Sequence, residues 1–293
     1  MRHVFIVNPV AGKGKSLQFI SEIKNLFAKS DTSHIIEITK YPGHATEIAR
    51  KHVSEGKCRL YSVGGDGTLN EIVNGMVGSD SSLAIIPCGS GNDFIKSITD
   101  NLNIKNILEK SVHGGEKLID LAKVGSQYFL NISSIGFDAE VLLNVNKIKK
   151  LPFITGRMAY ILGVITTIFK YSHNFLKISI DEQHMEAKSL LIAVANGRYY
   201  GGGMLAAPEA QIDDGLFDIC LIRNMSKVKI LKFFPKFIKG QHGKIAGVSF
   251  YRGKRVEIVC DGEVAMNIDG EVAKTSRTVF EIIQNGIKIV IPQ

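Results

Sequence analysis

The sequence predicts an α/β fold in which an N-terminal α/β domain is followed by an antiparallel β domain. In the first part of the chain, short apolar runs alternate with amphipathic ones, which is typical of a parallel sheet covered by helices. From about Lys117 onward, apolar residues recur at every second position, as in antiparallel strands with one buried face. The length of 293 residues favours two domains, 1–122 and 123–293, although one large core stays open as an alternative.

The N-terminal part contains four predicted strands, each followed by a predicted helix. The strands are expected at 3–7, 35–39, 59–63 and 83–87, and the helices at 19–27, 45–53, 69–76 and from residue 92. The loops after the strands are rich in Gly, Pro, Asn or Ser. Because ligands bind at the carboxyl ends of strands in open parallel sheets, we expect function to lie in these loops.

Period-two runs continue to the end of the chain. They predict strands at 118–122, 128–132, 176–180, 190–194, 216–222, 256–260, 265–268, 279–283 and 287–291. Few helical stretches separate them, and the sequence has no repeat or low-complexity linker. The boundary near residue 122 therefore depends on the change of pattern alone.

Composition limits the partners and the cellular setting. A formal charge of +8 and a pI near 9.2 favour acidic partners, which include nucleotide phosphates, nucleic acid and anionic membranes. Four scattered cysteines predict reduced thiols, as in a cytoplasmic protein. The apolar run at 4–7 is too short for a signal peptide, and the longest apolar stretch, 158–169, is too short to span a bilayer. Any membrane contact should therefore be peripheral.

The first glycine-rich loop, residues 8–16, ends in Gly14-Lys15-Ser16, which suggests a P-loop. That motif requires a glycine five positions before Gly14, and the sequence has Pro9 there, which offers no backbone N–H to a phosphate. The loop still lies between a strand and a helix N-terminus, where free amides and the helix dipole favour an anion. Phosphate binding and a purely structural turn are equally open at this point.

Two further loops carry carboxylates among glycines. Residues 63–71 place three glycines around Asp66. Glycines let the backbone approach a phosphate, and a lone aspartate suits a magnesium ion or its bound water, although Asp66 could instead cap the next helix. Residues 87–94 repeat the design with Ser90 and Asp93. The two loops follow neighbouring strands and are expected to face one cleft.

This series of motifs resembles the diacylglycerol kinase catalytic family, which includes soluble bacterial diacylglycerol kinases and the sphingosine and ceramide kinases. The resemblance rests on Asn-Pro-x-x-Gly from residue 8, Gly-Gly-Asp-Gly-Thr from 64 and Pro-x-Gly-Ser-x-Asn-Asp-Phe from 87. It continues over nearly the whole chain through 119–121, 136–139, 196–197, 201–215 and 269–271. It implies an α/β nucleotide domain similar to that of NAD kinases and phosphofructokinases, followed by an antiparallel β-sandwich that meets the lipid.

The resemblance also implies roles for single residues. Glu271 is expected to be the catalytic base that accepts the proton of a lipid hydroxyl, and Asp66 to organise the magnesium of ATP. A second Asp-Gly-Glu at 261–263 is expected to be a solvated β-turn. Asp120 is either a supporting carboxylate or a simple exposed strand residue. The expected nucleotide and cofactor contacts are Asn8, Pro9, Gly12, Gly14, Thr39, Gly64, Gly65, Asp66, Gly67, Thr68, Asn70, Ser90, Asn92, Asp93 and Asp120.

A second magnesium site is implied around Asp214, where some bacterial relatives hold a structural ion. The expected ligands are the Asp214 carboxylate and the backbone oxygens of Gln211 and Leu216. Oxygen ligands of this kind suit a hard cation. A plain Asp-Gly turn is the alternative.

The resemblance predicts an ATP- and Mg²⁺-dependent lipid kinase that converts diacylglycerol, the first choice of substrate, to phosphatidic acid. We expect a cytoplasmic protein, peripheral at the inner face of the membrane, with a lipid alcohol and an anionic membrane surface as partners and no nucleic acid; a homodimer stays open. Segments 160–169 and 226–244 are candidates to reach the lipid, and for each a helix packed on the sandwich is the alternative. An NAD kinase-like enzyme and a catalytically silent lipid-binding protein are the rival functions.

Overall fold

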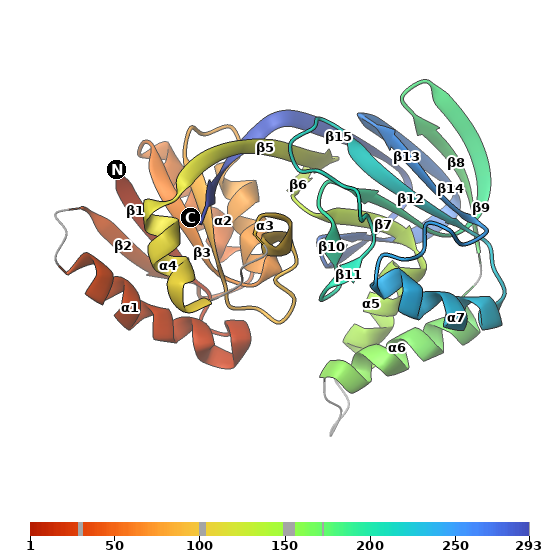
Figure 1. The fold of residues 1–293 in the computed structure, drawn as a ribbon, viewed down its shortest axis with the longest axis horizontal. Coiled ribbons are helices and arrows are strands. Elements are labelled where there is room, and N and C mark those ends of the chain that lie inside the picture. The colour runs from red at the N-terminus through yellow and green to blue at the C-terminus, as the bar shows by residue number, and fades with distance from the viewer. Residues whose placement is uncertain (29–31, 100–103, 149–155, 172, 293) are drawn as a thin grey trace.

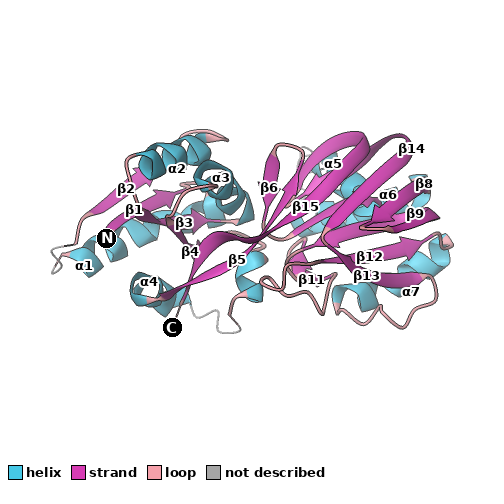
Figure 2. Cartoon of the chain, turned by 90° about the horizontal axis from the view of Figure 1, so that it is seen from above, coloured by secondary structure: helices cyan, strands magenta, loops and turns pink. Residues whose placement is uncertain are grey.

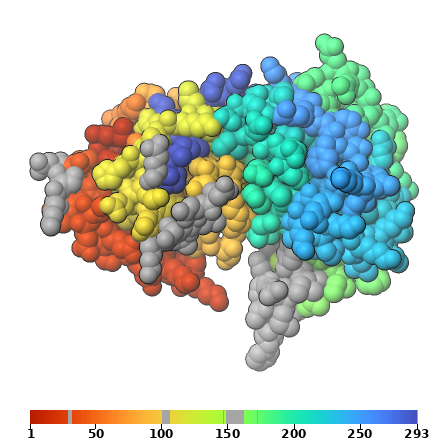
Figure 3. Space-filling view, in the orientation of Figure 1, coloured from red at the N-terminus to blue at the C-terminus, as the bar shows by residue number. Residues whose placement is uncertain are grey.

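The computed structural model describes residues 1–28, 32–99, 104–148, 156–171 and 173–292, which form two adjoining lobes (Figures 1 and 3). The N-terminal lobe holds the strands β1 (Arg2–Val7), β2 (His34–Ile38), β3 (Cys58–Gly64) and β4 (Ser82–Pro87). They pair in parallel in the order β4-β3-β1-β2. The predicted α/β character of this part is confirmed.

Helices connect these strands. The turn η1 (Ala11–Leu17) leads into α1 (Gln18–Phe27), and α2 (His44–Ser54) and α3 (Asp66–Met76) follow β2 and β3. The helix expected from residue 92 is instead a short 3-10 turn, η2 (Phe94–Ser97), and α4 (Ile104–His113) begins later. Asn92 has a left-handed φ of +49°, and its side chain closes the loop on Gly89. Because a left-handed residue cannot belong to a right-handed helix, the helical turn begins only after Asn92.

The C-terminal lobe is built from antiparallel strands, as predicted (Figure 2). Helices α5 (Phe137–Ile148), α6 (Gly156–Lys170) and α7 (Lys227–Ile238) lie along one side of it. Their apolar residues form a core with β9 and β12, and a further core lies among the strands. The strands are β5 (Gly115–Val124), β6 (Gln127–Phe129), β7 (Ile132–Gly136), β8 (Asn174–Ile180), β9 (Gln183–Ala195), β12 (Phe217–Arg223), β13 (Val248–Gly253), β14 (Arg255–Ile268) and β15 (Glu271–Ile291), with the small hairpin β10 (Tyr199–Tyr200) and β11 (Met204–Leu205). None of the described helices is long and apolar enough to cross a membrane.

The 21-residue strand β15 connects the two lobes. It begins against β14 and ends beside β4, where Lys288 and Ile289 align in parallel with Ser82 and Leu83. β5 runs antiparallel to its second half. The C-terminal end of the chain therefore lies in the sheet of the N-terminal lobe, across the division that we draw at residue 122.

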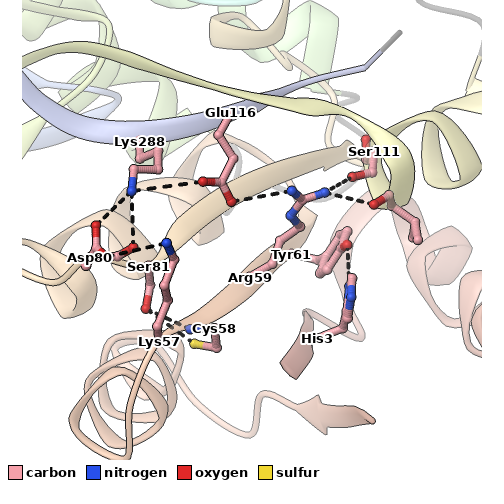
Figure 4. A network of polar contacts seen from close by, with 11 residues as sticks. His3, Lys57, Cys58, Arg59, Tyr61, Asp80, Ser81, Ser111, Glu116 and Lys288 are labelled. Carbon is pink, nitrogen blue, oxygen red and sulfur yellow. Dashed lines mark hydrogen bonds and ion pairs between the residues drawn. The ribbon is translucent and has the colours of Figure 1, made fainter. Parts of the chain in front are cut away.

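Polar contacts connect the end of β15 to the N-terminal lobe (Figure 4). Lys288 Nζ lies 2.7 Å from Asp80 Oδ1. The buried Arg59 of β3 donates to the carbonyl oxygen of Ser111 at 3.0 Å, and its Nη2 lies 3.4 Å from Glu116 Oε1. Breaking a buried ion pair leaves an uncompensated charge, which is strongly destabilising. The network thus fixes the sheet near the amino ends of β3 and β4, away from the loops at their carboxyl ends.

Candidate active site

The loops after β3 and β4 pack backbone against backbone. Both strands end side by side. A methyl group added to Gly89 would lie 2.5 Å from the Cα of Gly65, and one added to Gly91 would lie 2.7 Å from Asp66 Oδ2. Only glycine permits so close an approach. The two loops therefore meet, as their position after neighbouring strands predicted.

Asp66 connects these loops and does not cap its own helix. Its Oδ1 accepts a hydrogen bond from the backbone N–H of Asp93 at 2.8 Å, and α3 has no side-chain cap. Asp93 is itself buried, with Oδ1 2.8 Å from Lys96 Nζ and Oδ2 accepting from the backbone N–H of Gly202 at 2.7 Å. Burial, together with the neighbouring charge of Asp93, raises the pKa of Asp66 above its usual range. Asp93 thereby joins the loop after β4 to the C-terminal lobe.

The first glycine-rich loop lies against the same corner. Asn8 Nδ2 donates to Thr68 Oγ1 at 2.9 Å, and a methyl group on Gly12 would lie 2.3 Å from the carbonyl oxygen of Cys88. Gly12 and Gly14 have φ values of +58° and +88°, in the left-handed region that favours glycine. Three glycine-rich loops therefore converge at the carboxyl edge of the parallel sheet.

The Asp-Gly-Glu motif at 269–271 faces these loops from the C-terminal lobe. Asp269 accepts hydrogen bonds from the backbone N–H groups of Leu130 at 2.9 Å and Ile132 at 3.0 Å, and Asn70 reaches it from α3 at 3.4 Å. Burial raises the pKa of Asp269 to about 6. Glu271 is exposed and lines the cleft. The motif predicted a role for Glu271 and none for Asp269, whose backbone partners lie 139 and 137 residues earlier.

A cavity of about 310 Å³ lies between the loops and this motif. Five carboxyl groups line it, and within the described part of the chain no lysine, arginine or histidine does. Two of them had no predicted role: Asp269 and Asp138, the latter in the first turn of α5 and marked in the sequence only by its place in a family motif. The five are Asp66, Asp93, Asp138, Asp269 and Glu271.

The donor chemistry of the cleft fits a hard divalent cation. Carboxylate oxygens suit Mg²⁺, which usually keeps several waters and takes further ligands from substrate phosphates. The described residues contain no group of three or more His, Cys, Asp or Glu that could hold a metal ion. Asp66 and Asp93 are the carboxylates nearest the glycine loops.

A small apolar cavity in the C-terminal lobe adjoins the cleft that the carboxyl groups line. Phe137 of α5, Leu190 of β9 and Phe237 of α7 contribute to its walls. The residues common to both cavities are Asp138, Val141, Tyr200 and Met204. A cleft with five carboxyl groups therefore shares a wall with a small apolar cavity of about 20 Å³.

One of the expected nucleotide contacts, Asp120, has its hydrogen-bond partners away from the cleft. Asp120 is fully buried where the lobes join, with Oδ2 accepting from the backbone N–H of Gly215 at 2.6 Å and Oδ1 from that of Asn285 at 3.0 Å. The alternative of an exposed strand residue is therefore wrong, and Asp120 does not line the cleft. The remaining expected contacts Pro9, Gly64, Gly65, Gly67, Ser90 and Asn92 lie in or beside the three loops, and Thr39 follows β2.

Asp214 pairs with a cation of the chain itself. Arg252 donates from Nη2 to Asp214 Oδ2, and the backbone N–H of Leu216 donates to Oδ1 at 3.1 Å. Arg252 Nε also lies 3.5 Å from the buried Asp218, while Gln211 is exposed. A magnesium ion on Gln211, Asp214 and Leu216 stays a prediction, and it would compete with this guanidinium group.

Two family profiles match the chain. Residues 2–124 match the diacylglycerol kinase catalytic domain, and residues 131–291 match the YegS C-terminal NAD kinase beta sandwich-like domain. The Bacillus subtilis protein YtlR, assigned as a lipid kinase, is 31% identical over 93% of this chain and 94% of its own. A diacylglycerol kinase of Mycobacterium tuberculosis is 27% identical over 98% of this chain and 94% of its own.

A solved structure has the same fold. A Bacillus anthracis protein assigned as a diacylglycerol kinase superposes with a TM-score of 0.80 at 27% identity, covering 99% of this chain and 97% of its own. The profiles cover both lobes, including the glycine loops and the Asp-Gly-Glu motif that line the cleft. The chain therefore belongs to the diacylglycerol kinase catalytic family of lipid kinases.

Proposed function

We propose that the protein transfers the γ-phosphate of ATP, in the presence of Mg²⁺, to the free hydroxyl of a diacylglycerol and so forms phosphatidic acid. The observation that carries the proposal is the wall shared by a cleft with five carboxyl groups and an apolar cavity. Relatives in Bacillus subtilis and Mycobacterium tuberculosis are named diacylglycerol kinases, which favours diacylglycerol among the lipid alcohols.

In this proposal the nucleotide phosphates lie at the converging glycine loops. The backbone N–H groups at the start of α3 would face them, where the helix dipole favours an anion. Asp66 and Asp93 would hold Mg²⁺, directly or through water. When bound, the ion neutralises phosphate charge that develops during phosphoryl transfer.

Glu271 is the proposed general base. The lipid hydroxyl would give its proton to the Glu271 carboxylate while its oxygen bonds to the γ-phosphorus, and the bond from that phosphorus to the bridging oxygen would break to release ADP. Support comes from the position of Glu271 on the cleft and from the backbone hydrogen bonds that fix Asp269, two residues earlier.

An anionic membrane at the inner face of the cell is the proposed source of the lipid. One face of α7 packs into the core through Ile230, Phe233 and Phe237. Its other face leaves Val228 63% and Leu231 55% exposed. The lysines of this segment are Lys227, Lys229, Lys232, Lys236 and Lys239, and α7 has no acidic residue. Basic and apolar residues on one helical face suit an anionic bilayer.

The acyl chain requires a rearrangement beside α7. The apolar cavity is only about 20 Å³, far smaller than an acyl chain. Its walls include Phe233, Phe234 and Phe237 of α7, the same helix whose outer face presents apolar and basic residues. Contact of α7 with the membrane is therefore the proposed trigger that opens the cavity.

Transfer of labelled γ-phosphate tests the function. The full chain is incubated with ATP, Mg²⁺ and mixed micelles that contain a diacylglycerol, phosphatidylglycerol, a sphingoid base or an isoprenoid alcohol, with NAD as a soluble acceptor in parallel. Magnesium-dependent label in diacylglycerol supports the proposal. Label in another lipid would make that lipid the substrate in place of diacylglycerol. Label in NAD alone favours the NAD kinase alternative, and no label at all favours a silent lipid-binding protein.

A further inference from the structure

The loop after β2 contains a stacked aromatic pair that the proposed phosphoryl transfer does not use. The rings of Tyr41 and His44 lie with their centroids 4.6 Å apart and their planes inclined by 28°. Tyr41 is 50% exposed, and none of the other described phenylalanines and tyrosines of the N-terminal lobe is exposed. Thr39, an expected nucleotide contact two residues earlier, is buried. Tyr41 is therefore the aromatic surface that this lobe offers to a flat ligand.

Hydrogen bonds fix the two rings of this pair. Tyr41 Oη donates to Glu47 Oε2 at 2.7 Å. His44 Nδ1 accepts from the backbone N–H of Lys40 at 3.1 Å. One face of the Tyr41 ring is covered by His44 and its hydroxyl is held by α2. Because the ring is already oriented, a ligand that stacks on its other face loses little affinity to ordering it.

The loop of the aromatic pair is attached to the helix that begins at the glycine loops. Glu71 of α3 accepts hydrogen bonds from the backbone N–H groups of Gly43 at 2.8 Å and Ala45 at 3.0 Å. Glu71 follows Thr68 by three residues, which is about 4.5 Å along a helix. The pair therefore lies close to the proposed phosphate site at the start of α3 and is held to it by a carboxylate.

The cleft determines the direction in which a nucleotide extends. Within the described part of the N-terminal lobe, only residues that follow β3 and β4 line it. If the γ-phosphate lies in this cleft, the ribose and the base extend out of it. The strand order is β4-β3-β1-β2, so the loops away from the C-terminal lobe are those after β1 and β2 (Figure 1). These loops expose Val10 and Tyr41, which give apolar surface on this path.

We propose that Tyr41, backed by His44, is the platform on which the base of the nucleotide stacks. The inference rests on the ATP-dependent transfer proposed above and adds the place of the base. The face of Tyr41 turned away from His44 takes the base, because His44 covers the other face. A purine has two fused rings and covers more of the tyrosine than a pyrimidine does, so the platform favours ATP over CTP.

The test measures binding without lipid, so that transfer to an acceptor plays no part. Isothermal titration calorimetry gives the Kd of ATP, CTP and inorganic tripolyphosphate, each with Mg²⁺, for the full chain as wild type, Tyr41→Ala and Tyr41→Phe. Tripolyphosphate has the phosphates of ATP without the ribose and the base. Phe175→Ala is the matched control, because Phe175 is an exposed aromatic residue on β8 that lines neither the cleft nor the apolar cavity. Thermal unfolding checks that each variant is folded.

We expect Tyr41→Ala to raise the Kd of ATP by roughly five- to 150-fold, the range for loss of one base–aromatic stack, and to change that of tripolyphosphate by less than about twofold. It should also narrow the preference of wild type for ATP over CTP. Tyr41→Phe, which keeps the ring, and Phe175→Ala should bind ATP within about threefold of wild type.

Two results would overturn the inference while leaving the proposed function intact. One is Tyr41→Ala that binds ATP as tightly as wild type, or that loses ATP and tripolyphosphate equally. The other is wild type that binds ATP no more tightly than tripolyphosphate, because the base would then contribute nothing. If wild type binds neither ligand, the proposed function itself fails, and the place of the base fails with it.

Discussion

The two Asp-Gly-Glu tripeptides of this chain have the same sequence and different surroundings. The first, at 261–263, is an exposed irregularity inside β14, between the paired residues Val259 and Val264. It is solvated, as expected, but it is a bulge within a strand and not a turn. The second, at 269–271, forms the turn from β14 to β15 and lines the cleft. Both glycines are left-handed, with φ of +105° at Gly262 and +97° at Gly270.

The difference lies in what the rest of the fold brings to each tripeptide. Asp269 accepts hydrogen bonds from backbone N–H groups at the start of β7, and the N–H of Gly270 donates to Asn267 Oδ1 at 2.8 Å. In the outer tripeptide, Glu263 forms an ion pair with the exposed Lys274 at 3.0 Å. A carboxylate motif thus becomes a candidate for chemistry through anchoring and enclosure, which the tripeptide itself does not encode.

The largest expected difference between the two tripeptides is the loss of kcat when the glutamate of each is replaced. We expect Glu271→Gln to lower kcat by roughly 10²–10⁴-fold, the usual contribution of a general base. Its unfolding midpoint should stay that of wild type, because Glu271 is exposed. Phosphate transfer to lipid and urea unfolding measure the two quantities. Full turnover by Glu271→Gln would remove this residue from the role of base.

Replacing the aspartate of each tripeptide should change the free energy of unfolding by very different amounts. We expect Asp269→Ala to lower the free energy of unfolding by roughly 2–4 kcal/mol, because buried backbone N–H groups, among them those of Leu130 and Ile132, lose their acceptor. Asp261→Ala should change it by less than about 0.5 kcal/mol. Equilibrium unfolding in urea at neutral pH gives both values. Equal effects of the two substitutions would mean that the anchoring of Asp269 contributes nothing.

Features set by near neighbours in sequence were predictable, and contacts between distant segments were not. The strand-loop-helix rhythm and the glycines around Asp66 follow from local periodicity and turn chemistry. The links from Asn70 to Asp269 and from Asp93 to Gly202 join residues 199 and 109 apart, which no local pattern reveals. The parallel pairing of β15 with β4 was hidden for the same reason.

Contacts within the candidate site were hidden for the same reason. A motif predicted a role for Glu271, but nothing in the sequence shows that backbone N–H groups of Leu130 and Ile132 hold Asp269 or that Asp138 lines an apolar cavity. The helix expected from residue 92 was wrong: the left-handed Asn92 lies outside the helical region, and the segment after it is a 3-10 turn that ends at Ser97. The nucleotide contacts and the magnesium ligands Gln211, Asp214 and Leu216 stay predictions.

The pH dependence of the unfolding free energy should also distinguish Asp269 from Asp261. The pKa of Asp269 in the folded protein, about 6, lies above its usual value of 3.8, so the folded state binds the proton more tightly than the unfolded chain. The stability that this proton contributes is fully present below about pH 4 and is lost as the pH rises through 6. In magnesium-free buffer, wild type should lose on the order of 2–3 kcal/mol relative to Asp269→Asn between pH 4 and 7. Asp261→Asn should show no such trend, and a flat difference for Asp269→Asn would mean that its carboxyl titrates normally.

The outer glutamate should give the smallest effect of all. Glu263 and Lys274 form an ion pair whose side chains are 62% and 66% exposed, so solvent and salt screen their attraction. We expect Glu263→Gln to change the unfolding free energy by at most about 0.5 kcal/mol and kcat by less than about twofold. A double-mutant cycle with Lys274→Met should give a coupling energy of similar size that shrinks in high salt. A loss of activity comparable to that of Glu271→Gln would put the outer tripeptide in the active site, and enclosure would then no longer explain which of two identical motifs is used.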